Sequence, residues 1–351
     1  MVDNQSLLEP YALSSTLHLK NRVVMAPMTR DMSHDDLSPT KAMAEYYARR
    51  ADAGLIITEG TIIRPDAKGY KNVPGIYTPA HIDGWKRVTD SVHEQGGKIF
   101  SQIWHLGRVS HPHYLNGELP LSASETTMTG KLHRAEGLSH GKSRAVSVAE
   151  IKSLVESYAI AAKSAMQAGF DGVEVHGANG YLIDQFMHYH TNLRDDEYGG
   201  SPENMARFAL EVVKACGEAI GFDKVGLRVS PAAYINEIAG DKRDAAGFQL
   251  LFEKLNKLGL AYVHTGNFND KNLFEDLGNK TMTEFIRAHY RGTLIAAGSY
   301  NFDEAAEKIK TKQFDLIAIG RPFIANPDLI QRLQNNQEIK AYEASMLNVL
   351  Y

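Results

Sequence analysis

The sequence predicts an α/β protein of the (β/α)8 (TIM) barrel class, formed as a single domain over residues 1–351, with a core at 21–334 and a tail at 335–351. Short apolar runs rich in β-branched residues alternate eight times with longer amphipathic stretches. Such alternation implies a parallel sheet covered by helices, and eight units favour closure into a barrel. An open doubly wound sheet is the alternative, but it is expected to carry a Gly-x-Gly-x-x-Gly motif, and the chain has none.

The composition is that of a globular protein with a large core, because 43% of the 351 residues are hydrophobic and 23% are charged. The net charge of −4, with Lys and Arg scattered, argues against nucleic acid or a membrane surface as a partner. The single cysteine, Cys216, can form no disulfide within the chain. No signal-peptide pattern begins the sequence, and no stretch approaches about 20 apolar residues. We therefore expect a cytoplasmic protein.

The predicted strands are short apolar runs. They lie at residues 22–26, 55–63, 98–106, 172–176, 225–230, 260–265, 293–296 and 316–319. The first ends at Pro27, since proline has no N–H to donate to a sheet. A hairpin lead-in is expected at residues 17–20. After the third strand, residues 107–145 are rich in His, Gly, Ser and Pro without periodicity, which predicts a long lid or binding loop.

The predicted helices begin and end at recognisable signals. Pro39 stands at a first helical position, Ser147 and Glu150 form a capping box, and Gly96 ends the second helix. The helices are predicted at residues 40–53, 81–95, 147–168, 201–220, 245–258, 282–289, 301–310 and 326–333.

The residues at the predicted strand ends are the functional candidates, because chemistry in barrels lies on the loops that follow the strands. Gly298 and Gly320, after the last two strands, are placed to hold a phosphate through backbone N–H groups, and Arg321 adds a charged donor. Thr29, Gln102 and Arg228 suit the polar edge of a flat heterocycle, with Trp104 beside it. Together they predict a phosphorylated planar cofactor across the barrel mouth, although each glycine taken alone is better explained by an ordinary turn.

The stretch VEVHGANGYLIDQF at residues 173–186 carries the chemistry we expect. It begins as a buried strand and then places His176, Asn179 and Tyr181 just beyond the strand end. His and Asn can donate hydrogen bonds to an oxygen that gains negative charge, and Tyr can give up a proton. The stretch therefore predicts a site that polarises a carbonyl and protonates a nearby carbon. A turn whose polar side chains cap their own backbone explains the same residues about equally well.

These segments resemble the old yellow enzyme family of FMN-dependent ene-reductases, which fold as (β/α)8 barrels. The most specific match begins at HGANGYLIDQF and continues to the Arg-Phe pair at residues 207–208. Further matches are NRVVMAPMTR, ITEGTIIRP, AKGYKNVPGIYT, FSQIWHLGRVSHP, GLRVSP and DLIAIGRPFIANPDLI. They extend from residue 21 to residue 330, which is nearly the whole chain.

The resemblance implies tightly but non-covalently bound FMN, with NADPH or NADH as hydride donor and small electrophilic alkenes as substrates. The implied FMN-binding residues are Pro27, Met28, Thr29, Gly60, Gln102, Arg228, Gly298, Ser299 or Tyr300, Gly320 and Arg321. His176 and Asn179 are implied to hold the substrate's carbonyl oxygen, and Tyr181 to donate the proton. The residues implied to shape the substrate pocket are Tyr70, Trp104 and Phe268.

Two other functions stay open from the residues alone. His105, His176 and His264 all fall at strand ends, and three histidines can bind zinc, as in metal-dependent barrel hydrolases. Against this, the first strand lacks the His-x-His, and the eighth the Asp, of amidohydrolase-type barrels. A flavin-binding barrel that stores or senses flavin without turnover is the second alternative. Two further histidine pairs are interpreted as loop surface rather than ligands: His111 with His113, and His188 with His190.

Two segments depart from the family pattern. Family members usually carry a tyrosine in a tail that reaches the active site, and the ending AYEASMLNVLY does not match it cleanly. Whether Tyr342 or Tyr351 takes that role is open. Residues 115–145 are also unlike common members, which leaves the substrate range open. The oligomeric state is not predicted.

Overall fold

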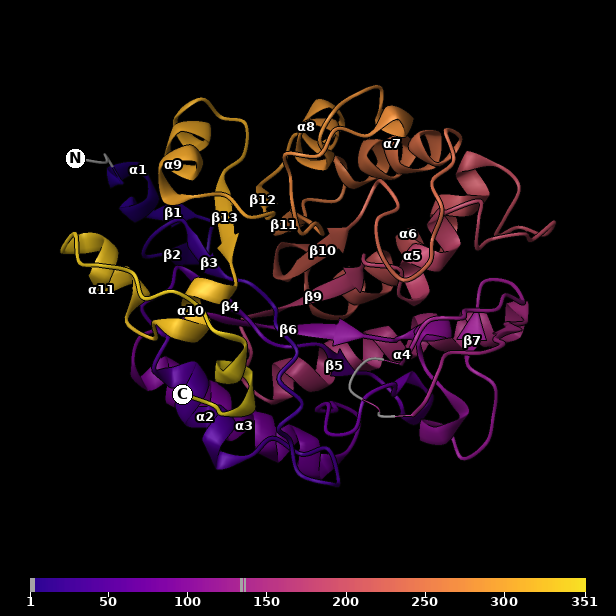
Figure 1. The fold of residues 1–351 in the computed structure, drawn as a ribbon, viewed down its shortest axis with the longest axis horizontal. Helices are drawn as coiled ribbons and strands as arrows, with labels where there is room; N and C mark the ends of the chain where they lie inside the picture. Colours follow the sequence, from indigo (N-terminus) through magenta and orange to yellow (C-terminus); the bar gives the residue numbers. More distant parts are fainter. Residues whose placement is uncertain (1–3, 133–134, 136) are drawn as a thin grey trace.

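The computed structural model describes residues 4–132, 135 and 137–351, which form a closed β/α barrel (Figure 1). Within these residues, eight parallel strands build the wall: β3 (Val23–Met25), β4 (Leu55–Ile57), β6 (Ile99–Trp104), β9 (Gly172–Gly177), β10 (Val225–Val229), β11 (Tyr262–Thr265), β12 (Leu294–Ala296) and β13 (Leu316–Ile319). Pairing of β13 with β3 and of β4 with β6 closes the cylinder. The predicted fold class is confirmed.

Helices surround the barrel (Figure 1). In the described part of the chain they are α1 (Gln5–Leu8), α2 (Lys41–Ala48), α3 (Pro79–Glu94), α4 (Val148–Gln167), α5 (Leu182–Met187), α6 (Pro202–Ile220), α7 (Asp244–Leu255), α8 (Met282–His289), α9 (Phe302–Lys310), α10 (Arg321–Ala325) and α11 (Leu329–Gln334). The predicted capping box is present, since Ser147 and Glu150 bond each other's backbone at the start of α4. None of these helices has the length and apolar character that a membrane crossing requires.

An antiparallel hairpin closes the amino end of the barrel. A hairpin was predicted in this part of the sequence, at residues 17–20. Its strands are β1 (Tyr11–Ala12) and β2 (His18–Leu19). Leu13, Leu17 and Leu19 pack with residues from the beginnings of the barrel strands, including Leu55 and Leu316. The lower barrel is therefore filled by apolar side chains. The opposite end remains for polar groups.

Polar side chains occupy the barrel interior nearer the carboxyl ends of the strands. Gln102 on β6 pairs in register with Glu174 on β9, and Arg228 on β10 pairs with both His176 and His264 on its two neighbours. Side chains of residues paired in register on parallel strands point to the same side of the sheet. The register thus gathers these five polar residues inside one barrel, just beneath its mouth.

Three local predictions were wrong. The predicted strand at 55–63 is split into β4 and β5 (Thr61–Ile62), because the hydroxyls of Thr58 and Thr61 both bond the carbonyl of Glu59 and interrupt the ladder. Helices α5 and α10 were not predicted, since each is short and its sequence was assigned to a loop or left out. Helix α2 ends at Ala48 rather than at residue 53. The long excursion holds the short strands β7 (Leu121–Ser122) and β8 (Arg144–Ala145).

Candidate active site

A cavity of about 570 Å³ opens at the carboxyl ends of the barrel strands. Nine of the residues predicted to bind a cofactor or substrate line it: Pro27, Met28, Arg228, Phe268, Gly298, Ser299, Tyr300, Gly320 and Arg321. Arg228 belongs to β10, and the others come from the loops after β3, β11, β12 and β13. The fold therefore brings together residues that lie almost 300 positions apart in the sequence.

One end of the cavity carries a tight turn beside an arginine. Gly298 has φ of +131°, and a Cβ there would lie 2.5 Å from the backbone nitrogen of Asp270, so only glycine fits. Ser299 follows in the left-handed region, at φ +62°. Its hydroxyl accepts a hydrogen bond of 3.3 Å from Nη2 of Arg321. A cation, a hydroxyl and turn N–H groups thus converge where a phosphate can bind.

Two glycines near the mouth pack closely against large side chains, because neither carries a side chain of its own. A Cβ on Gly60 would lie 2.2 Å from Cε3 of Trp104, so the indole packs directly on the glycine backbone. Gly320 faces the sulfur of Met28, which a Cβ would approach to 3.2 Å. Thr29, half-buried, follows Met28 in the same loop. Such a surface suits a planar ring.

Beneath the mouth, a buried carboxylate holds two of the polar side chains. Oε1 of Glu174 accepts a hydrogen bond of 2.7 Å from Nε2 of Gln102, and Oε2 lies 2.8 Å from Nδ1 of His264. Burial raises the pKa of Glu174, but the neighbouring His264, Arg228 and Gln102 outweigh it and hold the pKa below its ordinary value. The group is therefore an anion inside the barrel.

Two of the three predicted catalytic residues, His176 and Tyr181, form one aromatic cluster with Tyr70 and Trp104. The Trp104 ring lies 5.9 Å from that of His176, nearly parallel, and 4.7 Å from that of Tyr181, edge to face. The hydroxyls of Tyr70 and Tyr181 are 3.3 Å apart. His176, Tyr181 and the two pocket aromatics thus share one small volume at the exit of β9.

The cluster fixes the protonation states of its two acid–base groups. Burial lowers the pKa of His176 well below its usual value, and the charge of Arg228 adds to this, so the imidazole is neutral at pH 7. The N–H of Ala178 donates to Nδ1 of His176 (3.4 Å), which leaves the ring proton on Nε2. Burial raises the pKa of Tyr181, so the phenol stays protonated. The site therefore offers a neutral donor and a proton source.

Asn179 is held in a left-handed conformation, at φ +60°, by the loop that follows β10. Ser230 Oγ accepts its backbone N–H (3.0 Å), and Nδ2 of Asn236 donates to its carbonyl (2.7 Å). The hydroxyl of Tyr234 donates to its side-chain oxygen at 2.5 Å. With Oδ1 engaged, the amide presents Nδ2 as its free donor. The sequence did not predict this role for Tyr234, because nothing local marks it.

The tail borders the same cavity, which the sequence left open. Its lining includes residues 339–342, so Tyr342 lies at the cavity, whereas the Tyr351 side chain is 66% exposed. Asn326 holds this strap by donating to the carbonyl of Lys340 (3.0 Å) and accepting its N–H (2.9 Å). The buried Arg50 binds the carbonyl of Tyr351 at 2.8 Å.

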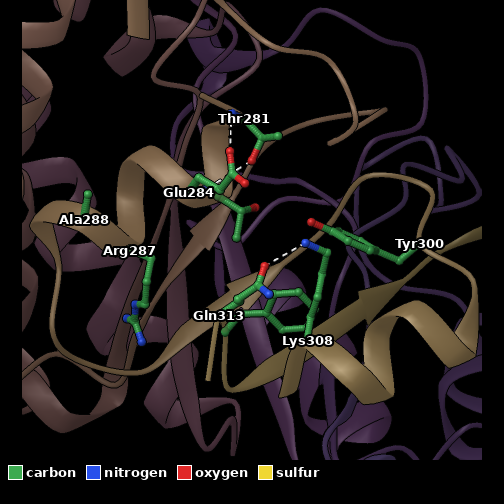
Figure 2. A pocket seen from close by; sticks show the side chains of 9 residues that line it. Thr281, Glu284, Arg287, Ala288, Tyr300, Lys308 and Gln313 are labelled. Carbon is green, nitrogen blue, oxygen red and sulfur yellow. Dashed lines mark hydrogen bonds between the residues drawn. The ribbon is translucent and has the colours of Figure 1, made fainter. Parts of the chain in front are cut away.

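A second hollow, of about 260 Å³, lies outside the barrel between α8 and α9 (Figure 2). Its polar side chains are bonded to one another: Glu284 caps Thr281, and Lys308 donates to Gln313 (Figure 2). Arg287 pairs with Asp315. These groups are therefore engaged with the protein.

The assignment of His188 to the surface was wrong. The side chain is fully buried, with Nε2 3.3 Å from Asp184 and Nδ1 2.8 Å from Asp244. Burial opposes its charge, but the two carboxylates outweigh this and raise the pKa of His188 to about 10. Asp184 also accepts the N–H of Gly180 (2.7 Å), so the ion cluster supports the turn that carries Asn179. His190, by contrast, is exposed, as predicted.

The histidines considered as zinc ligands are used otherwise. Nδ1 of His105 accepts the N–H of Gly107 (3.1 Å), and Nδ1 of His264 faces Glu174. Over the ranges 4–132 and 137–351, with residue 135, no group of three His, Cys, Asp or Glu side chains is arranged to hold a metal ion. The geometry does not support the zinc hydrolase alternative.

The comparisons with known proteins cover nearly the whole chain. The profile of the NADH:flavin oxidoreductase / NADH oxidase family matches residues 6–340. Putative 12-oxophytodienoate reductase 11 of Oryza sativa subsp. japonica is 41% identical over 346 residues, covering 97% of this chain and 94% of that protein. The 12-oxophytodienoate reductase 2 of Arabidopsis thaliana is 40% identical, covering 97% and 91%.

Two solved structures have the same fold. The old yellow enzyme homologue of Zymomonas mobilis superimposes with a TM-score of 0.91 at 34% identity, covering 97% of this chain and 96% of that one. Morphinone reductase in complex with tetrahydroNAD gives a TM-score of 0.89 at 40% identity, covering 97% and 94%.

The side chains at the mouth have the chemistry that FMN binding requires. Ser299 and Arg321 suit its phosphate, and the absence of a side chain at Gly320, beside Met28, leaves room for its ring. Arg228 adds a buried guanidinium whose Nε has no partner among the described residues, as expected of a group that meets a bound anion or carbonyl. The chain belongs to the NADH:flavin oxidoreductase / NADH oxidase family, as an FMN-dependent oxidoreductase of the old yellow enzyme type that uses NAD(P)H.

Proposed function

We propose that this enzyme reduces the activated C=C bond of α,β-unsaturated carbonyl compounds and related electrophilic alkenes, such as maleimides and nitroalkenes, in a ping-pong cycle. The observation that carries the proposal is the grouping of His176, Asn179 and Tyr181 at the exit of β9. His176 is paired in register with Arg228, which lines the cavity. An imidazole, an amide and a phenol in this arrangement match the needs of conjugate reduction. Relatives named as reductases support the same class of reaction.

The cofactor would be held along its whole length. Gly298, Ser299 and Arg321, which line the cavity, would bind the phosphate. Pro27 and Met28, with Gly60, would lie under the ring. The polar edge of the ring would meet Thr29, Gln102 and Arg228, and the arginine charge would stabilise the reduced state. When bound, FMN accepts a hydride from NADPH or NADH and delivers it to the alkene. The protein's own work is positioning and electrostatics.

The donors of the site activate the substrate. Nε2–H of His176 and the amide of Asn179 would hold the carbonyl oxygen and stabilise the enolate-like charge that develops on it. Removing one such donor typically costs on the order of 10²–10³ in rate. Tyr181 would then give its proton to the α-carbon, a contribution on the order of 10²–10⁴. Tyr70 bonds the same phenol and fixes its direction.

The pocket above the ring would take small molecules. Tyr70 and Trp104 form one wall of it, and Phe268, whose side chain is 60% exposed, stands at the rim. A planar enone can stack between such aromatics. We place the enzyme and its substrates in the cytoplasm, with no nucleic acid or membrane partner, on the basis of charge and the single cysteine.

The Tyr181→Phe variant tests the proposal. We expect enone reduction to slow by about 10²–10⁴, because the proton source is lost. Anaerobic bleaching of the flavin by NADPH should remain near the wild-type rate, because that step needs no proton from Tyr181. Stopped-flow absorbance of the two half-reactions measures both.

Equal losses in the two half-reactions would show that Tyr181 is a structural residue. A yellow protein inert to a panel of enones, maleimides and nitroalkenes would instead favour flavin storage. The wild-type protein is therefore assayed against this panel first, with NADPH and NADH in parallel.

A further inference from the structure

The buried carboxylate of Glu174 takes no part in the steps above, yet it sits directly behind the cofactor mouth. It is fully buried, as is His264, and Gln102 is 3% exposed. A buried anion is costly unless its lone pairs are satisfied. Here both carboxylate oxygens accept a hydrogen bond, one from each of these neighbours. Because burying this carboxylate is energetically costly, we looked for a function that requires it.

The strand register explains how the contact arises. Gln102 on β6 and Glu174 on β9 are paired residues, so their side chains project side by side into the barrel. On the far side, Glu174 is paired with Gly226, whose missing side chain leaves room for the Tyr262 ring. Burial and the nearby Glu174 raise the pKa of Tyr262, so the tyrosine ring lies beside the carboxylate on this side.

An ionised carboxylate only accepts hydrogen bonds, and this fixes the amide of Gln102. The nitrogen of the amide must face Glu174, because its oxygen would be repelled there. The oxygen, Oε1, is left on the opposite side, where it makes no hydrogen bond to the described residues. The same argument orients His264: burial lowers its pKa, Nδ1–H donates to Glu174, and Nε2 keeps a buried lone pair without a partner.

We propose that Glu174 is a positioning residue that makes Gln102 a hydrogen-bond acceptor toward the flavin, so that the pocket recognises the imide N3–H of the ring. The inference rests on the proposed placement of Gln102 at the polar edge of the ring. Glu174 acts only through Gln102. No proton or electron is transferred in this role.

For the substitution Glu174→Gln, we predict that the Gln102 amide turns over and that FMN affinity falls. His264 keeps its proton on Nδ1, because a proton on Nε2 would have no acceptor among the described residues. The oxygen of the new amide therefore faces His264 and its nitrogen faces residue 102. Gln102 must then turn its own oxygen inward and its nitrogen toward the ring, where it meets N3–H donor to donor. We expect FMN affinity of the apoprotein to fall roughly 10- to 100-fold, as for an unsatisfied buried polar group.

The exchange variant Gln102→Glu/Glu174→Gln supplies the rescue. Gln at position 174 can bond His264 through its oxygen and Glu at position 102 through its nitrogen, which leaves a carboxylate oxygen free to accept N3–H. The total charge is unchanged. FMN affinity should return to within a few-fold of wild type. A residue that only stabilised the fold would not be rescued by moving its charge to a neighbouring strand.

The test is FMN titration of apoprotein, followed by flavin fluorescence, for wild type and both variants, with thermal unfolding as a check of folding. Wild-type affinity in Glu174→Gln, or an exchange variant no better than the single one, would overturn the inference. If Glu174→Gln does not fold, ¹⁵N NMR of wild-type protein loaded with ¹⁵N-labelled FMN decides. A protected, hydrogen-bonded N3–H supports the inference, and a rapidly exchanging one overturns it. Neither readout depends on alkene reduction, so each is independent of the proposed reaction.

Discussion

Burial sets the protonation state of individual residues around the mouth. His176 is neutral and Tyr181 protonated for this reason, while Glu174 remains charged only because its partners outweigh burial. Glu59 is the opposite case. Its Oε2 accepts the N–H groups of Arg30 (3.0 Å) and Asp31 (3.1 Å), but burial dominates and raises its pKa from 4.5 to about 7. This residue therefore links stability to pH.

The raised pKa of Glu59 determines whether stability rises or falls with pH. The folded protein holds this proton more tightly than the unfolded chain, so the stabilisation is present below pH 4.5 and is lost as pH rises through about 7. In Glu59→Gln the loss cannot occur. We expect this variant to gain stability relative to wild type between pH 5 and pH 8, by on the order of 3 kcal/mol at most.

Urea unfolding of both proteins at intervals from pH 5 to pH 8 measures the effect. The exposed Glu118→Gln serves as control and should follow wild type. Parallel stability curves for wild type and Glu59→Gln would contradict the linkage.

At the scale of elements, the loop after β10 supports the turn that carries Asn179. Asn236 and Glu237 both adopt left-handed conformations, at φ +55° and +53°. Nη2 of the buried Arg108 binds both of their carbonyls at 2.9 Å, and the Glu237 carboxylate accepts the N–H of Gly130 (2.7 Å). The loop is thus tied to the long excursion on one side and to Asn179 on the other.

This arrangement predicts that Tyr234 acts through Asn179. In Tyr234→Phe the amide loses the donor that fixes its oxygen, so it can rotate away from the substrate. We expect kcat/KM for an enone to fall roughly 10-fold, less than the loss of the donor itself. In an Asn179→Ala background the same change should cost nothing further.

Steady-state kinetics of the four proteins in this cycle supply the measurement. Tyr189→Phe is the matched control, because its hydroxyl bonds the Gly200 carbonyl instead. An equal loss from Tyr234→Phe in both backgrounds would show that the Tyr234 hydroxyl does not act through Asn179, since the phenylalanine ring keeps the contact with Phe268.

The tail is a second element, and its position beside the cavity should slow the release of FMN. Asn326 ties it down beside the cavity through two hydrogen bonds to Lys340. Two such bonds are worth about 1 kcal/mol each. We expect Asn326→Ala to release FMN about 10-fold faster, as measured by transfer of flavin to a scavenging apoprotein. The exposed Asn335→Ala should release it at the wild-type rate, and equal rates for both variants would exclude a role for the strap.

At the scale of the whole molecule, the barrel separates stability from chemistry. The hairpin of β1 and β2 fills the amino end with leucines, whereas the site lies at the carboxyl end. Leu19 is 1% exposed there. We expect Leu19→Ala to lower the free energy of unfolding by about 2–5 kcal/mol, because it leaves a cavity in the core.

KM for the alkene should not change in Leu19→Ala, since the substitution is remote from the mouth. Urea denaturation and steady-state kinetics together test this separation. Leu193→Ala, at a side chain 68% exposed, is the control for stability. A changed KM in Leu19→Ala would show that the two ends of the barrel are coupled.

The sequence by itself determined the barrel class, most element positions and the residues gathered at the mouth. These features rest on short-range signals: the alternation of apolar runs, the caps, and side chains that follow each strand. Glu174 also had a local signal, since it stands two residues before His176 and so points to the same side of β9. What that buried glutamate contacts could not be inferred.

Only the tertiary structure decided which side chains support the site. The bonds from Tyr234 to Asn179, from His264 to Glu174 and from Arg50 to Tyr351 join residues 55, 90 and 301 positions apart. The burial of His188 between two carboxylates and the path of the tail along the cavity depend on the same kind of contact. Periodicity and turn signals extend over a few residues, whereas these contacts exist only after the strands have closed into a cylinder and set their register.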